Sequence, residues 1–273
     1  MRELKIAIAG VGTVGSGLID ILKKNNNLIN KNSSQKIIVT AVASRRKIFL
    51  KENIFKSSKI FSNATELLKF DNYDVLVELI GGEDGVAKKI IFNALNKNKH
   101  VVSANKALFA KHGEKILKLA DKKNLYVGME ASVAGVIPII KILKEFLSSN
   151  RVKSVFGILN GTSNYILSKM LETNQSFNSI LTTAQKLGYA ESDPKYDIDG
   201  TDTAHKLSII SSLSFESKFN MKQIYIEGIS NIDLIDLQNA DALGYRIKLL
   251  GLTERKGSKL IQFVYPCLIK KNQ

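Results

Sequence analysis

A G-x-G-x-x-G turn near the start of the chain constrains the fold more than any other feature. Its glycines, Gly10, Gly12 and Gly15, lie between an apolar run, Leu4–Ala9, and an amphipathic helical segment. The first glycine of such a turn allows a tight bend, the second lets a pyrophosphate approach the backbone, and the third lets helix and strand pack closely. The pattern alone is weak evidence. Its position between a strand and a helix favours a dinucleotide site over an ordinary glycine turn.

The first half of the chain alternates between predicted strands and predicted helices. This alternation is typical of an α/β fold with a parallel sheet. We therefore expect a Rossmann-type, doubly wound parallel sheet over residues 1–129. The predicted strands are Leu4–Ala9, Lys36–Ala43, Asp74–Ile80 and His100–Ser103; the predicted helices run through Leu18–Leu22, Ala87–Asn96 and His112–Lys122; a polar loop is predicted at Asn25–Gln35.

The pattern changes near Glu130, where a segment of small residues leads to Pro138. We place a domain boundary there and expect an α+β domain over residues 130–273. The predicted elements are a strand at Val152–Leu159 and helices at 138–147, Thr162–Glu172, Phe177–Leu187 and Thr201–Leu213.

Composition and charge exclude several classes of protein. The apolar runs are far shorter than the roughly 20 residues that cross a bilayer, and the N-terminus has no secretory signal, so we expect no membrane span. A single cysteine, Cys267, cannot form an internal disulfide, which favours a cytoplasmic location. The net charge is +15, but the lysines are scattered and lack interleaved aromatic residues. An anionic cofactor or a lysine-rich composition is therefore favoured over nucleic-acid binding.

The second predicted strand ends in basic residues. NAD sites normally carry an acidic residue there, which binds the ribose 2′-hydroxyl. Here the sequence is Ser44-Arg45-Arg46-Lys47. Guanidinium groups at Arg45 and Arg46 would pair with the 2′-phosphate of NADP, so we expect NADP, with NAD possible. The alternative is that both arginines are ordinary surface residues of a basic protein.

Residues 188–207 concentrate acid in a basic chain. Such a cluster needs a cation, which could be a substrate ammonium, a metal or nearby lysines. A helix capped by Gly200 or Thr201 would place Asp202 and Lys206 four residues apart on one face. On charge alone, a solvated acidic loop followed by a surface ion pair is an equal alternative. The five carboxylates are Glu191, Asp193, Asp197, Asp199 and Asp202.

The segment Gly188–Leu207 resembles the signature of homoserine dehydrogenases, which is approximately G-[YF]-A-E-x-D-P-x-x-D-[IV]-x-G-x-D-x-A-x-K-L. Further similar stretches follow in the family's order and cover most of the chain. These stretches are Gly10–Gly15, Val77–Gly82, Ala104–Leu108, Glu130–Gly135 and Gly157–Leu167.

The resemblance implies NAD(P)H-dependent interconversion of L-aspartate 4-semialdehyde and L-homoserine, a step toward threonine, methionine and isoleucine. Hydride delivery to an aldehyde leaves an alkoxide, which a nearby acid must protonate. By the family motif, Lys206 is that acid, and Lys106 orients the same oxygen beside the nicotinamide. Two alternatives stay open: a different NAD(P)-dependent amino-acid aldehyde oxidoreductase, and a truncated homologue that binds cofactor without turnover.

The resemblance also implies the binding sets. Glu191, Asp202 and Gly188 would hold the substrate, with the two carboxylates on its ammonium. Asp197 and Asp199 are expected to form turns, and residues 160–164 to begin a capped helix that supports the substrate pocket. Oxygens of Glu130, Val133, Gly135 and Ile137 would bind a monovalent cation such as sodium, although Val136 replaces a glycine that the family often has. The implied cofactor set is Gly10, Gly12, Thr13, Val14, Gly15, Arg45, Arg46 and Lys106.

The chain ends soon after the strand-like run Phe263–Ile269, where homologues usually continue. We therefore expect a short form, with a catalytic domain incomplete at its C-terminus and without the regulatory ACT domain. The family is dimeric through the sheet of this domain, and open sheet edges also favour pairing. A homodimer is the expected assembly.

Overall fold

The computed structural model describes residues 2–46, 55–190 and 193–271. They form two compact units, Met1–Ile139 and Ile140–Gln273. The predicted fold class is confirmed, because a parallel sheet is followed by a unit with a separate sheet and its own helices. Within the described ranges, no helix is both long enough and apolar enough to cross a bilayer.

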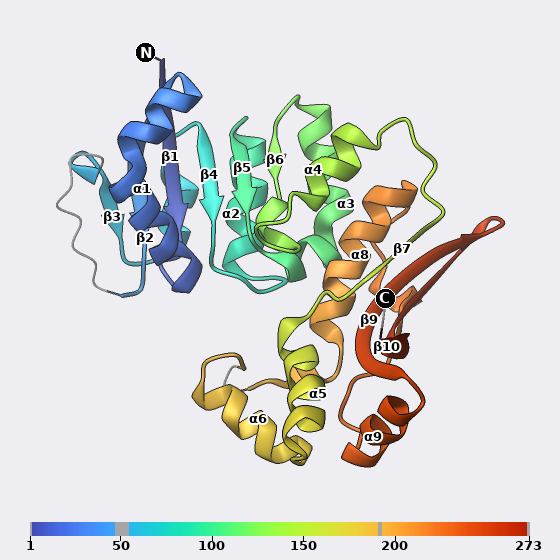
Figure 1. Ribbon diagram of the computed structural model, residues 1–273. Helices are drawn as coiled ribbons and strands as arrows, with labels where there is room; N and C mark the ends of the chain where they lie inside the picture. Colours follow the sequence, from blue (N-terminus) through green and yellow to red (C-terminus); the bar gives the residue numbers. More distant parts are fainter. Residues whose placement is uncertain (1, 47–54, 191–192, 272–273) are drawn as a thin grey trace. The chain divides into compact units, whose positions relative to one another are not determined.

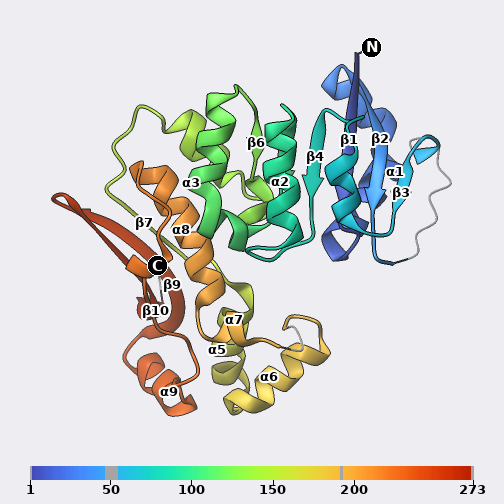
Figure 2. The same cartoon turned by 180° about the vertical axis from the view of Figure 1, so that it is seen from behind.

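The first unit is built on a parallel six-stranded sheet in the order β3-β2-β1-β4-β5-β6. Figures 1 and 2 show α1 on one face of this sheet and α2 and α3 on the other. The strand order reverses between β1 and β4, so a crevice is expected at their carboxyl ends. The elements are β1 Arg2–Ala9, α1 Thr13–Ser33, β2 Gln35–Ala43, β3 Lys59–Phe61, η2 Ala64–Lys69, β4 Val75–Glu78, α2 Val86–Asn96, β5 His100–Ser103, α3 Lys106–Lys122, β6 Val127–Gly128 and η3 Glu130–Ser132.

The prediction of a polar loop over Asn25–Gln35 is wrong, because α1 continues to Ser33. Asparagine favours turns when its side chain competes for backbone groups, but here two asparagines bond each other along the helix. The Asn30 amide donates to Asn26 Oδ1 at 3.0 Å, and Asn30 Oδ1 accepts the Ile37 N–H at 3.1 Å. This bond to β2 stabilises the last turns of α1. The third helix is also longer than predicted, since α3 begins at Lys106.

The second unit contains a mixed four-stranded sheet in the order β7-β9-β10-β8. Strands β9 and β10 form a long antiparallel hairpin, of which only the Phe263–Ile269 part was predicted. The elements are α4 Ile139–Lys141, the π-helical turn η4 Ile142–Phe146, β7 Ser154–Gly157, α5 Gly161–Thr173, α6 Phe177–Lys186, α7 Lys195–Ile198, α8 Thr201–Phe215, η5 Met221–Gln223, β8 Tyr225–Ile226, α9 Leu234–Ala242, β9 Tyr245–Lys256 and β10 Lys259–Lys270.

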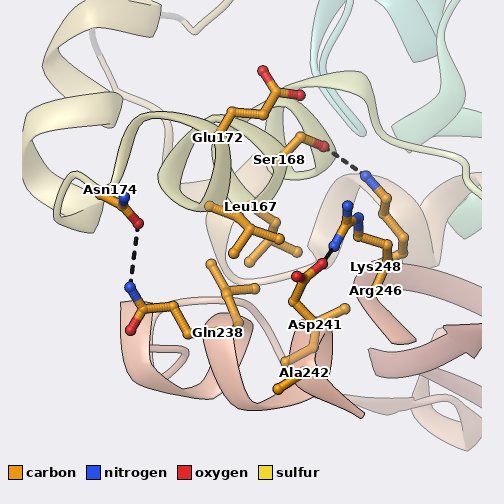
Figure 3. A pocket seen from close by; sticks show the side chains of 12 residues that line it. Leu167, Ser168, Glu172, Asn174, Gln238, Asp241, Ala242, Arg246 and Lys248 are labelled. Carbon is orange, nitrogen blue, oxygen red and sulfur yellow. Dashed lines mark hydrogen bonds and ion pairs between the residues drawn. The ribbon is translucent and has the colours of Figure 1, made fainter. Parts of the chain in front are cut away.

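The core of the second unit lies between its helices and one face of the sheet. Along β9, Leu249, Gly251 and Thr253 are buried while their neighbours are partly exposed, as the two-residue period of a strand requires. Helices α5 and α8 cover this face, with Leu167 and Leu207 in the same apolar cluster as Leu249. A cavity of about 500 Å³ lies beside this core and is lined by α5, α9 and the start of β9 (Figure 3). We call it the α5–α9 pocket.

Candidate functional site

A cleft of about 520 Å³ opens at the carboxyl ends of the strands in the first unit. Its walls come from the turns after β1, β2 and β4, which meet at the point where the strand order reverses. The residues of these turns that line it include Gly10, Val11, Gly12, Ser44, Arg45, Arg46, Leu79, Ile80, Gly81 and Asp84.

The three glycines of the first turn differ in what surrounds them. Gly10 has φ +101°, and a Cβ there would lie 2.7 Å from the carbonyl oxygen of Leu79. A Cβ at Gly15 would collide with the carbonyl oxygen of Gly10. Beside Gly12, by contrast, the space is open. The turn is therefore tight at Gly10, closely packed at Gly15 and accessible at Gly12, followed by the first turn of α1 with Thr13 and Val14.

Arg45 and Arg46 are exposed where β2 ends, and both line the cleft. The buried Ser44 fixes the turn before them: its N–H donates to the Phe61 carbonyl at 2.9 Å, and its Oγ bonds the backbone of Arg46. Two guanidinium groups are thus available at the cleft for an anion.

Asp84 is an acidic residue of the cleft, but cations surround it. It accepts hydrogen bonds from Lys111, from His112 Nε2 at 2.9 Å and from Lys88 at 3.2 Å. The Lys111 bond, followed by those of His112 and Lys88, holds the pKa of Asp84 well below its usual range. The carboxylate therefore stays ionised, and Lys111 and Lys88 offset its negative charge beside the cleft.

Glu78 organises the loop beside the cleft, a role that its place in the Val77–Gly82 motif does not reveal. The carboxylate is fully buried, accepts the N–H groups of Ile80 at 2.8 Å and Gly81 at 3.1 Å, and accepts Ser103 Oγ at 2.6 Å. Three donors compensate its desolvation. An acid at the end of the apolar strand Val75–Glu78 is the signal that could have identified it.

Hydrogen bonds link Glu78 through Ser103 to Asn105, the residue before Lys106. Ser103 Oγ accepts the Asn105 N–H at 3.1 Å, and the Asn105 amide donates to the Gly82 carbonyl at 2.7 Å. Asn105 Oδ1 also caps α3 by accepting the Leu108 N–H at 3.1 Å. Lys106 is the first residue of α3 and follows β5, whose carboxyl end lies at the same sheet edge as the cleft.

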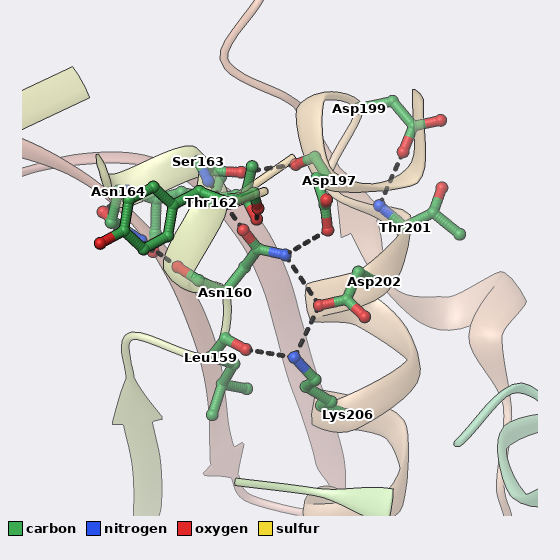
Figure 4. A network of polar contacts seen from close by, with 12 residues as sticks. Leu159, Asn160, Thr162, Ser163, Asn164, Asp197, Asp199, Thr201, Asp202 and Lys206 are labelled. Atoms are coloured by element: carbon green, nitrogen blue, oxygen red, sulfur yellow. Dashed lines mark hydrogen bonds and ion pairs between the residues drawn. The ribbon is translucent and has the colours of Figure 1, made fainter. Parts of the chain in front are cut away.

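In the second unit, a buried polar network joins α5, α7 and α8 (Figure 4). Asp202 Oδ2 accepts Lys206 Nζ at 2.6 Å and the Asn160 amide at 2.8 Å. The prediction that Asp202 and Lys206 share one face of a helix is therefore confirmed. Their side chains are 4% and 18% exposed, so Asp202 is buried, Lys206 is partly buried and the pair does not lie on the open surface.

Asn160 is the centre of this network. Its Oδ1 caps α5 by accepting the Ser163 N–H at 2.8 Å, as the capped helix start predicts. Its amide group donates to Asp197 Oδ1 at 2.7 Å as well as to Asp202. Lys206 Nζ also donates to the Leu159 carbonyl at 2.6 Å, so two acceptors fix the ammonium. The network can hold a proton at a defined position, Lys206 Nζ.

The other residues of the acidic segment are partly described. Asp199 forms a turn, since its Oδ1 accepts the Thr201 N–H at 2.8 Å. Gly188 has φ +78° just after α6, and the next residue, Tyr189, stacks on Tyr165 with ring centroids 4.7 Å apart. Glu191 lies outside the described residues.

The predicted cation loop follows η3. Two of its four carbonyls already accept backbone bonds: that of Glu130 from Val133 N–H at 3.4 Å, and that of Ile137 from the N–H of Ile139 at 2.8 Å. Val136 is exposed and has φ +81°, a region that favours glycine, so valine is strained there. In the described ranges, no three His, Cys, Asp or Glu residues form a cluster that could hold a metal ion.

Two family models match the chain in sequence order. Residues 10–130 match the NAD-binding domain of homoserine dehydrogenase, and residues 138–273 match the model described as homoserine dehydrogenase. Together they include the glycine turn, the Glu78 loop and the Asp202–Lys206 pair. The first unit thus contains an NAD(P)-binding domain.

Known proteins match over the whole chain. A homoserine dehydrogenase of Neisseria gonorrhoeae is 43% identical over 273 residues, which are 100% of this chain and 62% of the relative. The crystal structure of a homoserine dehydrogenase from Thiobacillus denitrificans has a TM-score of 0.92 and 40% identity, covering 100% of this chain and 63% of that one. A putative homoserine dehydrogenase from Archaeoglobus fulgidus has a TM-score of 0.88 and 32% identity, covering 99% of this chain and 85% of that one. The chain therefore belongs to the homoserine dehydrogenase family.

Proposed function

We propose that this chain interconverts L-aspartate 4-semialdehyde and L-homoserine with NADP as the hydride carrier. The observation that carries the proposal is the partly buried Asp202–Lys206 pair of the family motif, which Asn160 holds through Asp202. The chain spans 62% of the length of the Neisseria relative. The activity of the whole protein is therefore proposed from the family and from the geometry of both units.

The cleft of the first unit supports NADP as the cofactor. Gly12 borders open space where a pyrophosphate would approach, and Arg45 and Arg46 lie where a ribose 2′-phosphate would be bound. A hyperthermophilic archaeal homoserine dehydrogenase mutant was solved in complex with NADPH, and it shares this fold with a TM-score of 0.82 at 22% identity, over 100% of this chain and 84% of that one. Thr13, Val14 and Gly15 would place the N-terminus of α1 against the phosphates.

The proposed chemistry divides between carrier and protein. NADPH, held by the glycine turn and by Arg45 and Arg46, would supply a hydride to the aldehyde carbon, and the carbonyl π electrons would move to oxygen. Lys206 Nζ then transfers a proton to that oxygen, and the reverse reaction returns the proton to Lys206. Asp202 and the Leu159 carbonyl orient the ammonium. Lys106 would bind the same oxygen and stabilise its developing negative charge.

Substrate and cation binding complete the proposal. Glu191 and Asp202 would hold the substrate ammonium, and Gly188 would offer backbone contact. A monovalent cation, sodium in our proposal, would be bound by oxygens of Glu130, Val133, Gly135 and Ile137. We also place the protein in the cytoplasm, because its single cysteine cannot form an internal disulfide and disulfides are typical of oxidising compartments.

We further propose a homodimer through the sheet of the second unit. Four apolar side chains lie opposite one another across all four strands, on the face away from Leu249. Phe156 and Tyr225, at the two ends of this row, are 69% and 57% exposed. A row of apolar side chains with exposed aromatic residues on a sheet face is typical of a protein interface. The row consists of Phe156, Leu252, Phe263 and Tyr225.

The direct test is oxidation of L-homoserine by the purified 273-residue chain at mildly alkaline pH, followed by absorbance of the reduced cofactor. We expect higher kcat/KM with NADP than with NAD. Removing both guanidinium groups by Arg45→Ala/Arg46→Ala should raise the KM for NADP about tenfold or more and change that for NAD little. The control Lys115→Ala/Lys122→Ala removes two exposed charges from α3 and should leave the KM for NADP and the KM for NAD unchanged.

The same assay tests the residues of the second unit. Lys206→Ala should lower kcat about 100-fold or more, because it removes the proton donor. Glu191→Ala should mainly raise the KM for L-homoserine. Lys186→Ala, an exposed lysine at the end of α6, is the control. An unchanged rate in Lys206→Ala would refute the assigned role, and a folded wild-type chain that binds NADPH without turnover would contradict the proposed activity.

A further inference from the structure

The α5–α9 pocket is a second polar site in the second unit, separate from the Asn160 network (Figure 3). The C-terminal half of α5, from Leu167 onward, lines one wall, and α9 with the first residues of β9 lines the other. Asn160 caps the opposite end of α5. The proposed dehydrogenase reaction uses no residue of this pocket.

Lys248 brings a positive charge into the pocket. Its Nζ donates to Ser168 Oγ at 2.6 Å, and Ser168 Oγ donates to the Asn164 carbonyl at 2.6 Å. Within the described part of the chain, Lys248 forms no ion pair with a carboxylate. Burial, followed by the nearby charge of Arg246, lowers the pKa of Lys248. A desolvated ammonium that is bonded to a neutral hydroxyl is well suited to bind an anion.

Arg246 adds a second positive charge on the same strand. Side chains two residues apart on a strand point to the same face, so Arg246 and Lys248 both line the pocket. The Arg246 guanidinium forms an ion pair with Asp241 at the end of α9, and Lys271 contacts the same carboxylate at 2.8 Å. The Asp241 carboxylate is thus shared by Arg246 and Lys271. Lys248 is a third positive charge near it, and it has no share in that carboxylate.

The rest of the lining selects among anions. Leu167, Leu171 and Leu237 contribute apolar surface, and Glu172 and Asp241 contribute carboxylates. A doubly charged phosphate would be repelled by these carboxylates and would leave the leucines uncovered. A singly charged carboxylate on an aliphatic body would bind Lys248 and also cover the apolar wall. If the molecule also carried an ammonium, it would share the Glu172 carboxylate with Lys169, whose Nζ lies 2.6 Å from Glu172 Oε2.

We propose that the α5–α9 pocket binds a small aliphatic carboxylate, with its carboxylate on Lys248 and its aliphatic part against Leu167, Leu171 and Leu237. An apolar α-amino acid and a simple branched carboxylic acid share this chemistry. A cavity of about 500 Å³ accommodates either of them. The pocket is rigid on the side of Lys248, because the Asn164 side chain bonds both backbone groups of Leu249, at 3.0 and 3.2 Å.

The test is calorimetric titration of the 273-residue chain at pH 7 with L-leucine, with 4-methylpentanoate and with inorganic phosphate. At least one of the two organic acids should bind with a Kd about tenfold lower than that of phosphate. Tighter binding of L-leucine would identify an amino acid as the source, and equal or tighter binding of 4-methylpentanoate a simple acid. Lys248→Met, which keeps the apolar stem, should raise the Kd about tenfold or more. Lys256→Met, at the exposed end of the same strand, is the control and should not change it.

Two further variants make the result decisive. Ala242→Trp adds bulk at an exposed position of the pocket and should abolish binding even if Lys248→Met fails to fold. Lys206→Met should leave binding intact, because Lys206 belongs to the Asn160 network. The proposal is overturned if neither organic acid binds, if phosphate binds as tightly as they do, or if Lys206→Met and not Ala242→Trp removes binding.

Discussion

Glu78 shows how one buried carboxylate can order the loop beside the cleft of the first unit. Its carboxylate holds the N–H groups of Ile80 and Gly81, which line the cleft, and the Ser103 hydroxyl next to α3. In Glu78→Gln, an amide nitrogen would replace one acceptor oxygen and oppose the Ser103 donor. We expect a loss of about 2 kcal/mol in the free energy of unfolding, since hydrogen bonds to charged groups contribute about 1.5–3 kcal/mol.

The same substitution should affect cofactor binding more than chemistry. We expect Glu78→Gln to raise the Kd for NADPH, measured by fluorescence titration, while kcat at saturating NADPH changes less. Ser103→Ala, which removes only one of the three donors, is the matched variant and should have a smaller effect on both quantities. An unchanged Kd for NADPH in a destabilised Glu78→Gln protein would limit Glu78 to a structural role.

Tyr73 makes stability depend on alkaline pH. The residue is 2% exposed, and burial, followed by the charge of Asp71, raises its pKa from 10.0 to about 12. Burial favours the neutral phenol in the folded state. The free energy of unfolding is therefore unaffected by Tyr73 ionisation below pH 10, and it falls as pH rises from 10 to about 12 because the unfolded chain loses this proton first. The shift corresponds to at most about 3 kcal/mol. Urea unfolding of wild type and Tyr73→Phe should be compared between pH 8 and 11. The difference between their free energies of unfolding should change with pH, and a constant difference would contradict this reasoning.

At the scale of elements, the start of α5 depends on a residue that serves two purposes. Asn160 caps the helix and also donates to Asp197 and Asp202. Asn160→Ala should therefore lower the free energy of unfolding by about 3 kcal/mol, more than the roughly 1 kcal/mol of an ordinary cap. Asn220→Ala, which removes the exposed cap of η5, is the control. Equal losses in urea denaturation of the two variants would show that the bonds to Asp197 and Asp202 add no stability.

Elements were predictable where the local pattern was strong. The strands β1, β2 and β5 and the helices α2, α6 and α8 follow from apolar periodicity, since each element buries one face or both. The asparagine-rich end of α1 was not predictable, because a bond from Asn30 to the backbone of β2 supports it. Long-range bonds of this kind override intrinsic helix propensity.

At the scale of the whole molecule, the proposed dimer can be tested through the sheet face of the second unit. Phe156→Lys/Leu252→Lys would place two charges in the apolar row and should convert a dimer to a monomer in sedimentation equilibrium. Leu268→Lys is the control, because Leu268 is 59% exposed but lies on the opposite face, paired with Ile247. A dimer that persists in the double variant would place the interface elsewhere.

The sequence by itself determined the alternation of strands and helices in the first unit, the glycine turn and the motif that carries Asp202 and Lys206. Each of these depends on residues close together in the chain, where periodicity, glycine geometry and helical spacing act directly. The tertiary structure alone decided that Asn160 meets Asp202, that Glu78 meets Ser103 and that α5 and β9 enclose a charged pocket. The physical reason is that these contacts join residues far apart in sequence, so they exist only once the elements that carry them have packed together.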